Sequence, residues 1–545
     1  MNKEQQIRSI WMVSREYEGL AGAGGVKDVC RQLAEALVRH AGCSVRVILP
    51  RYGFLDAEGL GFTLLHLPHR QGDAVCPDRF YDVFSVDMNY RLEERREVVS
   101  IWEKDIGGVR VYLVEAERFA EKLGVYTYTA AEEEKKVWQK KGSGHFDYFA
   151  MNILLQKAAL DLMILLDEQP DVIHCHDGHA ATLPAIMREG CGYRHYFRHS
   201  GAVVTIHNAG MGYHQEVDDL EFARAITGLP WHVIGSSRLG TSFDPFLAAA
   251  PYSVMNTVSE NYARELQETD EDQRTGWLGH NLLQRGVRLA GITNGIDPKM
   301  FDPTDPDRLG LAAPFDPLRG DLGGKVTCKK VVLERISHGE PFAEVEQLGT
   351  LADDPDLPLL TFIGRLTAQK GVDVLVEGLH SLLEEDSRCQ VLLLGSGDPF
   401  LEEQLTGLAE TGSGAGRFCF LRGYAPRLAT RIYAAGDFFL VPSLYEPCGL
   451  TDFMAQLLGN LPIVHHVGGL VKVLDGRTGF AYAEHDPLAL LRAIQRALDV
   501  YRTDMERIRK MQKEAVEQIL ARYTWKQVMR EYLLLYRQSL AKACR

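Results

Sequence analysis

The stretch "FFLVPSLYEPCGLTDF" (residues 438–453) places a charged side chain directly behind an apolar run. The run predicts a buried strand, and the proline, glycine and threonine that follow are typical of a turn that opens a helix. A charge at the mouth of a buried strand costs on the order of several kcal/mol unless a partner stabilises it. The partner of Glu446 is therefore the first question that this sequence raises.

Apolar runs of this kind recur along the chain and alternate with amphipathic helical patterns. Strands that alternate with helices predict parallel sheets with helices on both faces. The predicted strands include residues 9–13, 45–50, 109–114, 171–176, 202–208, 253–259 and 288–294 in the first half, and 358–364, 390–397, 417–423, 438–443 and 461–466 in the second. The clearest helical patterns cover residues 27–40, 373–386 and 487–501.

The chain is too long for one hydrophobic core. Its 545 residues exceed the roughly 250–300 residues at which a single core stops growing. We therefore predict two doubly wound α/β domains, residues 1–300 and 301–520, that face each other across a cleft. The segment 301–324 is rich in Pro, Asp and Gly and is interpreted as a surface connection between them. Ligands of such sheets bind beyond the carboxyl ends of the strands, so motifs at strand ends carry the most weight.

The charge and the cysteine content narrow the class of protein. A net charge of −14 argues against bulk binding of nucleic acid or of an anionic membrane, both of which favour a basic face. The ten cysteines are scattered without a CxxC pair, which indicates reduced thiols in the cytoplasm. The first apolar run, residues 10–13, is too short for a secretory signal, and no apolar stretch reaches the ~18 residues of a membrane span.

Two motifs follow predicted strands and suit an anion. "GAGGVKDV" (22–29) opens the first helix, where glycines let backbone N–H groups approach an anion, although a tight strand-to-helix turn explains it equally well. "FIGRLTAQKG" (362–371) carries Arg365 and Lys370 at a strand end. Arg as a fork and Lys as a point charge can hold a diphosphate. The alternative is two solvated surface charges.

A histidine-rich run ends one of the predicted strands. "HCHDGH" brings His174, His176, Asp177 and His179 together, and residues 174 and 176 share a face of the strand. A zinc site needs three or four converging ligands, and the strand ends inside this run. We therefore interpret the run as a strand terminus that delivers Asp177 to the cleft, with no metal. "TIHNAG" brings His207 to the end of the next strand, where functional and structural roles are about equally supported.

"EPCGLTDF" and "HHVGGLVKV" complete the set of motifs. Pro447 suits the first turn of a helix whose N–H groups would point at an anion. Gly468 and Gly469 form a second loop of backbone donors behind a strand. Glu446 then accepts a hydrogen bond from a bound hydroxyl group or opposes developing positive charge. Alternatively, it caps a helix or forms a buried ion pair with one of the two cations.

These motifs, with "NTVSENYARE", "GITNGID" and "LRGY", resemble the bacterial glycogen and plant starch synthases in the family order over nearly the whole chain. The resemblance implies a GT-B fold: two Rossmann-like domains, with residues 521–545 as a helix that crosses back to the first. It implies retaining transfer of glucose from ADP-glucose or UDP-glucose to the non-reducing end of an α-1,4-glucan, without metal or other cofactor. The first domain would serve the acceptor and the second the donor.

The resemblance also implies roles for individual residues. Arg365 and Lys370 would hold the donor diphosphate and stabilise it as it leaves, and Glu446 would act beside the reacting glucosyl unit. His207 and Asp177 would line the glucosyl and acceptor side. The donor-binding residues, with the loop residues acting through backbone amides and the tyrosine flanking the base, would be Gly24, Gly25, Asp28, Tyr424, Cys448, Gly449, Leu450, Thr451, Gly468, Gly469 and Leu470.

The chain departs from the family pattern at four places. Gly22 stands where the family has a lysine that touches the donor, and Lys27 lies one turn later. "HHVGGL" stands in place of "RRTGGL", which removes two arginines and a threonine hydroxyl. Lys472 replaces an aspartate, and Asp452 replaces a glutamine. These changes favour a degenerate, non-catalytic glucan-binding protein as one alternative.

A second alternative is a transferase of the same fold with a different acceptor, such as a sugar phosphate. A hydrolase with paired carboxylates is less attractive, because the motifs suit phosphate. The retained Arg365, Lys370 and Glu446 favour the glucan-elongating transferase.

Overall fold

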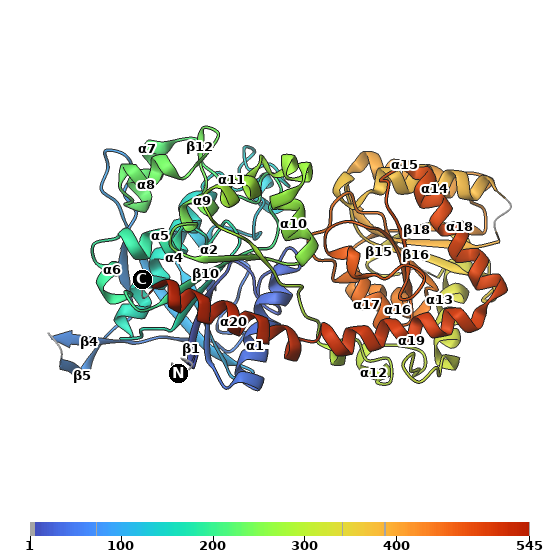
Figure 1. The fold of residues 1–545 in the computed structure, drawn as a ribbon, viewed down its shortest axis with the longest axis horizontal. Helices are drawn as coiled ribbons and strands as arrows, with labels where there is room; N and C mark the ends of the chain where they lie inside the picture. The colour runs from blue at the N-terminus through green and yellow to red at the C-terminus, as the bar shows by residue number, and fades with distance from the viewer. Residues whose placement is uncertain (1–5, 72–73, 341, 386–387, 544–545) are drawn as a thin grey trace. The chain divides into compact units, whose positions relative to one another are not determined.

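The computed structural model describes residues 6–71, 74–340, 342–385 and 388–543 (Figure 1). Contacts divide the chain into two compact units. Unit 1 consists of Met1–Gly295 with Trp525–Arg545, and unit 2 consists of Ile296–Thr524. The segment 301–324 lies inside unit 2, where its Phe315 is buried in a hydrophobic cluster. The interpretation of this segment as a connection between domains is therefore wrong, because its apolar residues contribute to a core.

Unit 1 is built on a ten-stranded sheet in the order β14-β13-β10-β9-β1-β2-β8-β7-β3, with β6 paired to β7. The strands of unit 1 are β1 Ser9–Val13, β2 Ser44–Pro50, β3 Thr63–Leu64, β4 Leu67–Gln71, β5 Ala74–Tyr81, β6 Phe84–Asp87, β7 Arg96–Ile106, β8 Val109–Glu115, β9 Val172–His176, β10 Gly201–Ile206, β11 Arg238–Leu239, β12 Ser242–Phe243, β13 Val254–Thr257 and β14 Ala290–Gly291. The strands from β14 to β8 are parallel, as the uniform apolar runs predict.

The parallel sheet of unit 1 reverses its strand order between β1 and β9. The chain runs outward through β2 and β8 on one side of β1 and through β10, β13 and β14 on the other side. Strands β7, β6 and β3 extend the sheet in antiparallel fashion, which the sequence did not predict. The run 288–294 supplies only a two-residue strand, Ala290–Gly291.

The helices of unit 1 cover this sheet. They are α1 Val26–Ala41, α2 Glu117–Ala120, α3 Ala130–Lys135, α4 Tyr148–Leu165, α5 Leu183–Glu189, α6 Tyr193–Tyr196, α7 Leu220–Thr227, α8 Trp231–Ser236, α9 Pro245–Ala249, α10 Glu260–Glu268, the 3-10 turn η1 Asp270–Thr275, α11 Leu278–Gln284 and α20 Trp525–Ala543. One of them, α4, is long and apolar enough to cross a bilayer by length and composition, but 78% of its apolar window is buried inside the protein. Helix α4 is a core helix of the sheet.

The last helix of the chain packs in unit 1, as the predicted fold requires. Figure 1 shows α20 alongside α1. The indole N–H of Trp525 donates to Gln32 at 2.7 Å, and the Tyr536 hydroxyl lies 3.0 Å from Nδ1 of His174. These buried contacts join the C-terminal helix to both α1 and β9.

Unit 2 contains a seven-stranded sheet in the order β15-β18-β17-β16-β19-β20-β21. Its strands are β15 Val345–Leu351, β16 Leu359–Leu366, β17 Gln390–Gly397, β18 Arg417–Gly423, β19 Phe438–Val441, β20 Leu461–His465 and β21 Phe480–Tyr482. All neighbours are parallel except the edge strand β15, which the sequence did not predict. The strand order reverses between β16 and β19, so their carboxyl ends form a topological switch point.

Helices cover both faces of the unit 2 sheet. They are η2 Pro298–Phe301, α12 Pro306–Leu309, α13 Gly323–Ser337, η3 Ala368–Lys370, α14 Val372–Glu384, α15 Pro399–Glu410, α16 Pro426–Ala435, α17 Thr451–Leu457, η4 Gly468–Lys472, α18 Pro487–Thr503 and α19 Met505–Arg522. Along β17, Val391 and Leu393 join one hydrophobic cluster, whereas Leu392 and Leu394 join another. This alternation explains the uniform apolar run and confirms the predicted α/β class.

Candidate active site

The switch point of unit 2 collects the side chains that the sequence singled out. Strands β16 and β19 are parallel neighbours, with Thr361 opposite Phe439. Arg365 and Lys370 follow from β16, and Glu446 follows from β19. Because parallel strands end at the same edge of a sheet, Lys370 and Glu446, 76 positions apart in the chain, meet in one place.

The partner of Glu446 is Lys370. Its ammonium lies 2.6 Å from Oε2 of Glu446, and the Ser443 hydroxyl donates to the same oxygen at 3.2 Å. The side chain of Lys370 is 23% exposed and that of Glu446 is 12% exposed, so the ion pair is partly shielded but accessible to a ligand. Burial would raise the pKa of Glu446, but the charge and hydrogen bond of Lys370, together with Lys472 and Ser443, lower it below its ordinary value. Glu446 is therefore an anion held by a cation.

The loop before Lys370 is fixed by local bonds. Thr367 caps the turn η3 by accepting from the amide of Lys370, and the amide of Leu444 donates to the carbonyl of Gln369 at 2.9 Å. Gly371 has a φ of +66°, and a Cβ there would lie 2.0 Å from the carbonyl oxygen of Pro442. Only glycine allows the two strand-end loops to approach this closely.

Two further side chains predicted around the donor, those of Arg365 and Tyr424, are exposed. Arg365 lies at the end of β16, and no carboxylate of the described residues forms an ion pair with it. Tyr424 follows β18 and is 79% exposed. Both side chains are available to a ligand at the carboxyl edge of this sheet.

Two loops of glycines lie against each other behind Glu446. The helix α17 begins at Thr451 rather than at Pro447, so the proline lies in the loop and not in the first helical turn. Gly468 and Gly469 open the turn η4, and a Cβ on either would lie 2.1 Å from a carbonyl oxygen, of Glu446 and Cys448 respectively. The two loops are thus in backbone contact.

The amides of the two loops differ in how they are used. Gly469 N–H donates to the carbonyl of Glu446 at 2.8 Å, and Leu470 N–H donates to that of Val467 at 2.9 Å. For the amides of Gly449 and Leu450 we find no acceptor among the described residues. The amides of Gly449 and Leu450 are therefore among those of the two loops that a ligand can use.

Two departures from the family pattern form one buried ion pair. The ammonium of Lys472 lies 3.1 Å from the carboxylate of Asp452, and their side chains are 5% and 0% exposed. Burial raises the pKa of Asp452 to about 6, against the opposing charge of Lys472. Read singly, each substitution suggests a damaged site, but together they form a matched pair.

The corresponding edge of unit 1 is formed by β9 and β10. Asp177 has a φ of +58° and accepts the amide N–H of His207 at 2.7 Å and of Asn208 at 3.4 Å. Burial raises the pKa of Asp177 to about 8. Burial, with His176 nearby, holds the pKa of His207 well below its ordinary range. Asp177 and His207 are thus predominantly neutral near pH 7.

The histidines of this edge bind each other and the protein. Nδ1 of His176 lies 3.0 Å from Nε2 of His207, and the two rings are stacked. Nε2 of His174 lies 2.7 Å from the hydroxyl of Thr205. Within residues 6–71, 74–340, 342–385 and 388–543, no group of three His, Cys, Asp or Glu side chains is arranged to hold a metal.

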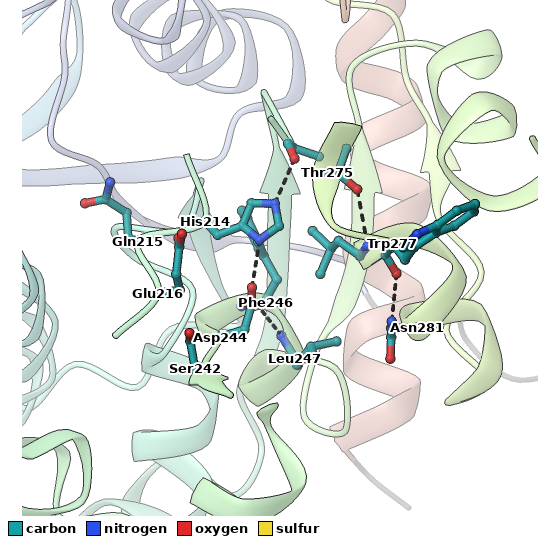
Figure 2. A network of polar contacts seen from close by, with 12 residues as sticks. His214, Gln215, Glu216, Ser242, Asp244, Phe246, Leu247, Thr275, Trp277 and Asn281 are labelled. Carbon is teal, nitrogen blue, oxygen red and sulfur yellow. Dashed lines mark hydrogen bonds and ion pairs between the residues drawn. The ribbon is translucent and has the colours of Figure 1, made fainter. Parts of the chain in front are cut away.

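A further histidine fixes the loop that follows β10. His214 lies between the carboxylate of Asp244, 2.8 Å from Nδ1, and the carbonyl of Ala209, 2.7 Å from Nε2 (Figure 2). Both neighbours only accept hydrogen bonds, so both ring nitrogens must donate and the ring is an imidazolium. Burial would lower the pKa of His214, but Asp244 raises it above its ordinary value. Asp244 in turn caps α9 through the amides of Phe246 and Leu247.

The glycine motif of unit 1 already holds an internal anion. The buried carboxylate of Glu16 accepts the amides of Ala23 at 2.8 Å and Gly24 at 3.1 Å, and the hydroxyl of Tyr126 at 2.8 Å. Gly25 precedes α1 as its N-cap. Glu16 therefore orders the loop around Gly24. The sequence did not predict this role, because a single glutamate outside any motif resembles a solvated surface charge.

Lys27 covers the position where the family has a lysine. A Cβ on Gly22 would lie 2.2 Å from Cδ of Lys27, so the stem of Lys27 folds back over this glycine. Its ammonium is 2.7 Å from the carboxylate of Asp28, in the first turn of α1. A cation therefore stands beside Asp28 despite the change at Gly22.

The two Rossmann-like units and the matches of both halves of the chain to glycosyltransferases place the protein in the GT-B class. Residues 9–283 match the starch synthase catalytic domain, and residues 357–499 match the glycosyl transferases group 1. The chain belongs to the starch synthase family.

Relatives and solved structures agree with this assignment. The chain is 33% identical to the glycogen synthase of Streptococcus gordonii, over 97% of this chain and 100% of that protein, and 30% identical to the glycogen synthase of Aeromonas salmonicida, over 98% of each. The catalytic domain of starch synthase IV from Arabidopsis thaliana, solved with ADP and acarbose, aligns with a TM-score of 0.74 and 25% identity over 98% of this chain and 100% of that one. Sucrose-phosphate synthase from Thermosynechococcus elongatus shares the fold, with a TM-score of 0.55 and 18% identity over 98% and 99% of the chains.

Proposed function

We propose that this protein transfers glucose from a nucleoside diphosphate glucose to the non-reducing end of an α-1,4-glucan, with retention of the anomeric configuration. Unit 2 holds the donor and unit 1 serves the acceptor. ADP-glucose and UDP-glucose are the candidate donors. The relatives named glycogen synthase and the starch synthase bound to ADP and acarbose support this class of reaction.

The cations of unit 2 act on the leaving group. Lys370 and Arg365 bind the diphosphate of the donor and stabilise the negative charge that it gains as the glycosidic bond to phosphate breaks. Attack from the same face lets the departing phosphate accept the proton of the acceptor hydroxyl, so a separate general base is not required. Glu446 opposes the positive charge that develops on the glucosyl ring.

The neutral edge of unit 1 suits a sugar. His207 and Asp177 carry little charge near pH 7, and Asp177 fixes the backbone of the loop after β10. Neutral donors and acceptors bind sugar hydroxyls without a large desolvation penalty.

The ion pair of Lys370 with Glu446, at 2.6 Å, carries this proposal. It puts a cation for the phosphate and an anion for the sugar ring at the topological switch point, where ligands of open α/β sheets bind. We also propose that the protein acts in the cytoplasm. In support, eight of the ten cysteines are found as free thiols.

Incubation with glycogen and either labelled ADP-glucose or labelled UDP-glucose tests the function. We expect label in the polymer with at least one donor, released as maltose by a β-amylase that requires α-1,4 linkages. If the label is transferred to a small sugar or sugar phosphate and not to glucan, the proposed acceptor is wrong and that small molecule takes its place. No transfer from either donor would contradict the proposal.

A further inference from the structure

Lys472 is the most heavily bonded side chain behind the two glycine loops of unit 2. Its ammonium lies 2.5 Å from the carbonyl oxygen of Cys448, 2.8 Å from that of Gly449 and 3.0 Å from that of Gly469. Its three N–H groups are thus all directed at backbone carbonyls. One buried cation therefore joins the loop that follows β19 to the loop that follows β20.

The direction of these carbonyls decides the direction of two amides. A peptide bond is planar and trans, so its N–H points opposite to its C=O. Because the carbonyls of Cys448 and Gly449 point to Lys472, the amides of Gly449 and Leu450 point away from it. For both of these amides, the described part of the chain offers no acceptor.

The local backbone conformation makes the two amides converge. Gly449 has a φ of +71°, and Leu450 has φ −104° and ψ −28°. A left-handed residue followed by a right-handed one directs successive N–H groups into a common concavity that binds anions. A Cβ on Gly449 would lie 2.7 Å from the Asp452 carboxylate and 3.0 Å from Nζ of Lys472, so the clamp also requires glycine.

Asp452 compensates the charge of Lys472 without competing for its bonds to the loops. The carboxylate is fully buried and lies 3.1 Å from Nζ, and the ammonium also stands over the ring of Phe453 at 4.5 Å. A buried lysine left alone would tend to lose its proton. The carboxylate of Asp452 places an opposite charge beside the buried ammonium, which offsets the cost of burying it.

We propose that Lys472 is a positioning residue for the donor: it clamps the two loops and aims the amides of Gly449 and Leu450 at a phosphate of the nucleoside diphosphate. The inference rests on the proposed function for the identity of the anion. The clamp itself does not, since it is defined by contacts within unit 2.

The chain offers a matched control in the same unit. Lys325 is also buried and donates to three carbonyls, of Ala434, Gly436 and Leu458, at 2.6–3.1 Å. None of these carbonyls belongs to the loops at 446–450 or 467–470. Lys325→Met therefore removes an equivalent set of bonds and measures the purely structural cost.

The test compares amide hydrogen exchange of residues 447–453 and ADP affinity in the full-length wild type, K325M, D452N and the double variant K472M/D452N. In the double variant we expect exchange and the Kd for ADP to rise about tenfold or more, with the donor KM rising more than kcat falls. In K325M we expect a lower Tm, with exchange and affinity within about twofold of wild type. D452N keeps the lysine but removes the charge that opposes it, and we expect effects on exchange and affinity between those of K325M and of the double variant.

The outcomes separate the clamp from the function. A folded double variant with wild-type exchange and wild-type ADP affinity would overturn the clamp, and so would equal effects of K325M and the double variant on the Kd. If the double variant does not fold, Lys472→Gln, which keeps one donor for the carbonyls, replaces it under the same criteria. A wild type that binds neither ADP nor UDP contradicts the proposed donor, while the exchange data still decide the clamp.

Discussion

The carboxyl edges of the two sheets differ in charge. At the edge of unit 2, Lys370 and Glu446 are ionised, partly exposed and paired at 2.6 Å, with Arg365 exposed in the same strand-end segment as Lys370. At the edge of unit 1, Asp177 and His207 are buried and predominantly neutral. The same doubly wound topology thus presents a charged edge in one unit and a neutral edge in the other.

This difference follows the chemistry of the two substrates that we propose. A site for a diphosphate needs cations that can exchange an internal partner for the ligand. Lys370 can do so by moving from Glu446 to a phosphate oxygen. A glucan has only hydroxyl groups, so a buried charge facing it would cost desolvation without gaining an ion pair. The two edges therefore predict different responses to mutation and pH.

Removal of the cation at the charged edge has the largest expected effect. Lys370→Ala removes a phosphate ligand and leaves Glu446 without its partner, and we expect transfer to fall about 10²–10³-fold. Steady-state transfer to glycogen measures it, and Lys510→Ala, at an exposed lysine of α19, is the control. Near-normal turnover of a folded Lys370→Ala variant would contradict the proposal that Lys370 binds the phosphate.

Neutralisation of the anion at the same edge comes next. Glu446→Gln keeps the shape but cannot oppose positive charge, so we expect kcat to fall about 10²-fold with a smaller change in the donor KM. The kinetic constants of the purified variant decide this. The opposite pattern, a raised KM with kcat retained, would make Glu446 a binding residue only.

At the neutral edge, Asp177→Asn tests whether the carboxyl group is protonated. The pKa of Asp177 is raised from an unfolded value of about 3.9 to about 8 in the fold. Its contribution to the free energy of unfolding therefore falls as the pH rises between these values, by about 1 kcal/mol per pH unit. Denaturant unfolding at pH 5.5 and 7.5 should show a shallower decline for Asp177→Asn. An identical pH dependence of variant and wild type would contradict a protonated Asp177.

His214 supplies a smaller effect with its own pH signature. Its pKa is raised in the fold, so its stabilisation is complete below the unfolded pKa of about 6.5 and is lost as the pH rises through the folded value. We expect His214→Gln, which loses one of two donors, to cost about 1–3 kcal/mol at pH 6 and less at pH 9. A cost that does not change with pH would exclude the imidazolium.

Chelation has the smallest expected effect. Because the side chains of Lys370 and Arg365 supply the positive charge for the leaving phosphate, we expect EDTA to leave transfer unchanged. The measurement is the initial rate with and without chelator, with MgCl₂ added back as the control. A large loss that Mg²⁺ restores would show that these cations do not suffice.

The comparison also shows how far the sequence reaches. Uniform apolar runs predicted β16 and β19, and neighbouring parallel strands end at the same edge of a sheet. The contact between Lys370 and Glu446 could therefore be predicted from the sequence. Of the two interpretations of Glu446, these contacts bear on one only: it forms a partly exposed ion pair with Lys370. The antiparallel strands β7 and β15 were not predicted, because mixed burial along both strands weakens the apolar pattern.

The missed residues share one physical reason. Asp452, Lys472 and Glu16 are charged side chains, and each is stabilised by a partner that the sequence does not identify. Asp452 and Lys472 pair with each other, and Glu16 accepts hydrogen bonds from backbone amides. Local patterns report burial and secondary structure, whereas a buried charge is explained only by the group across from it. The helix start at Thr451 instead of Pro447 has a related cause, because contacts with the loop at 467–470 hold the chain in a non-helical path.

The most direct test of the central claim is a crystal structure of this protein with bound ADP. We expect a phosphate oxygen within about 3 Å of the ammonium of Lys370, with the guanidinium of Arg365 on the same diphosphate. A diphosphate bound elsewhere, with Lys370 still paired only to Glu446, would contradict the account.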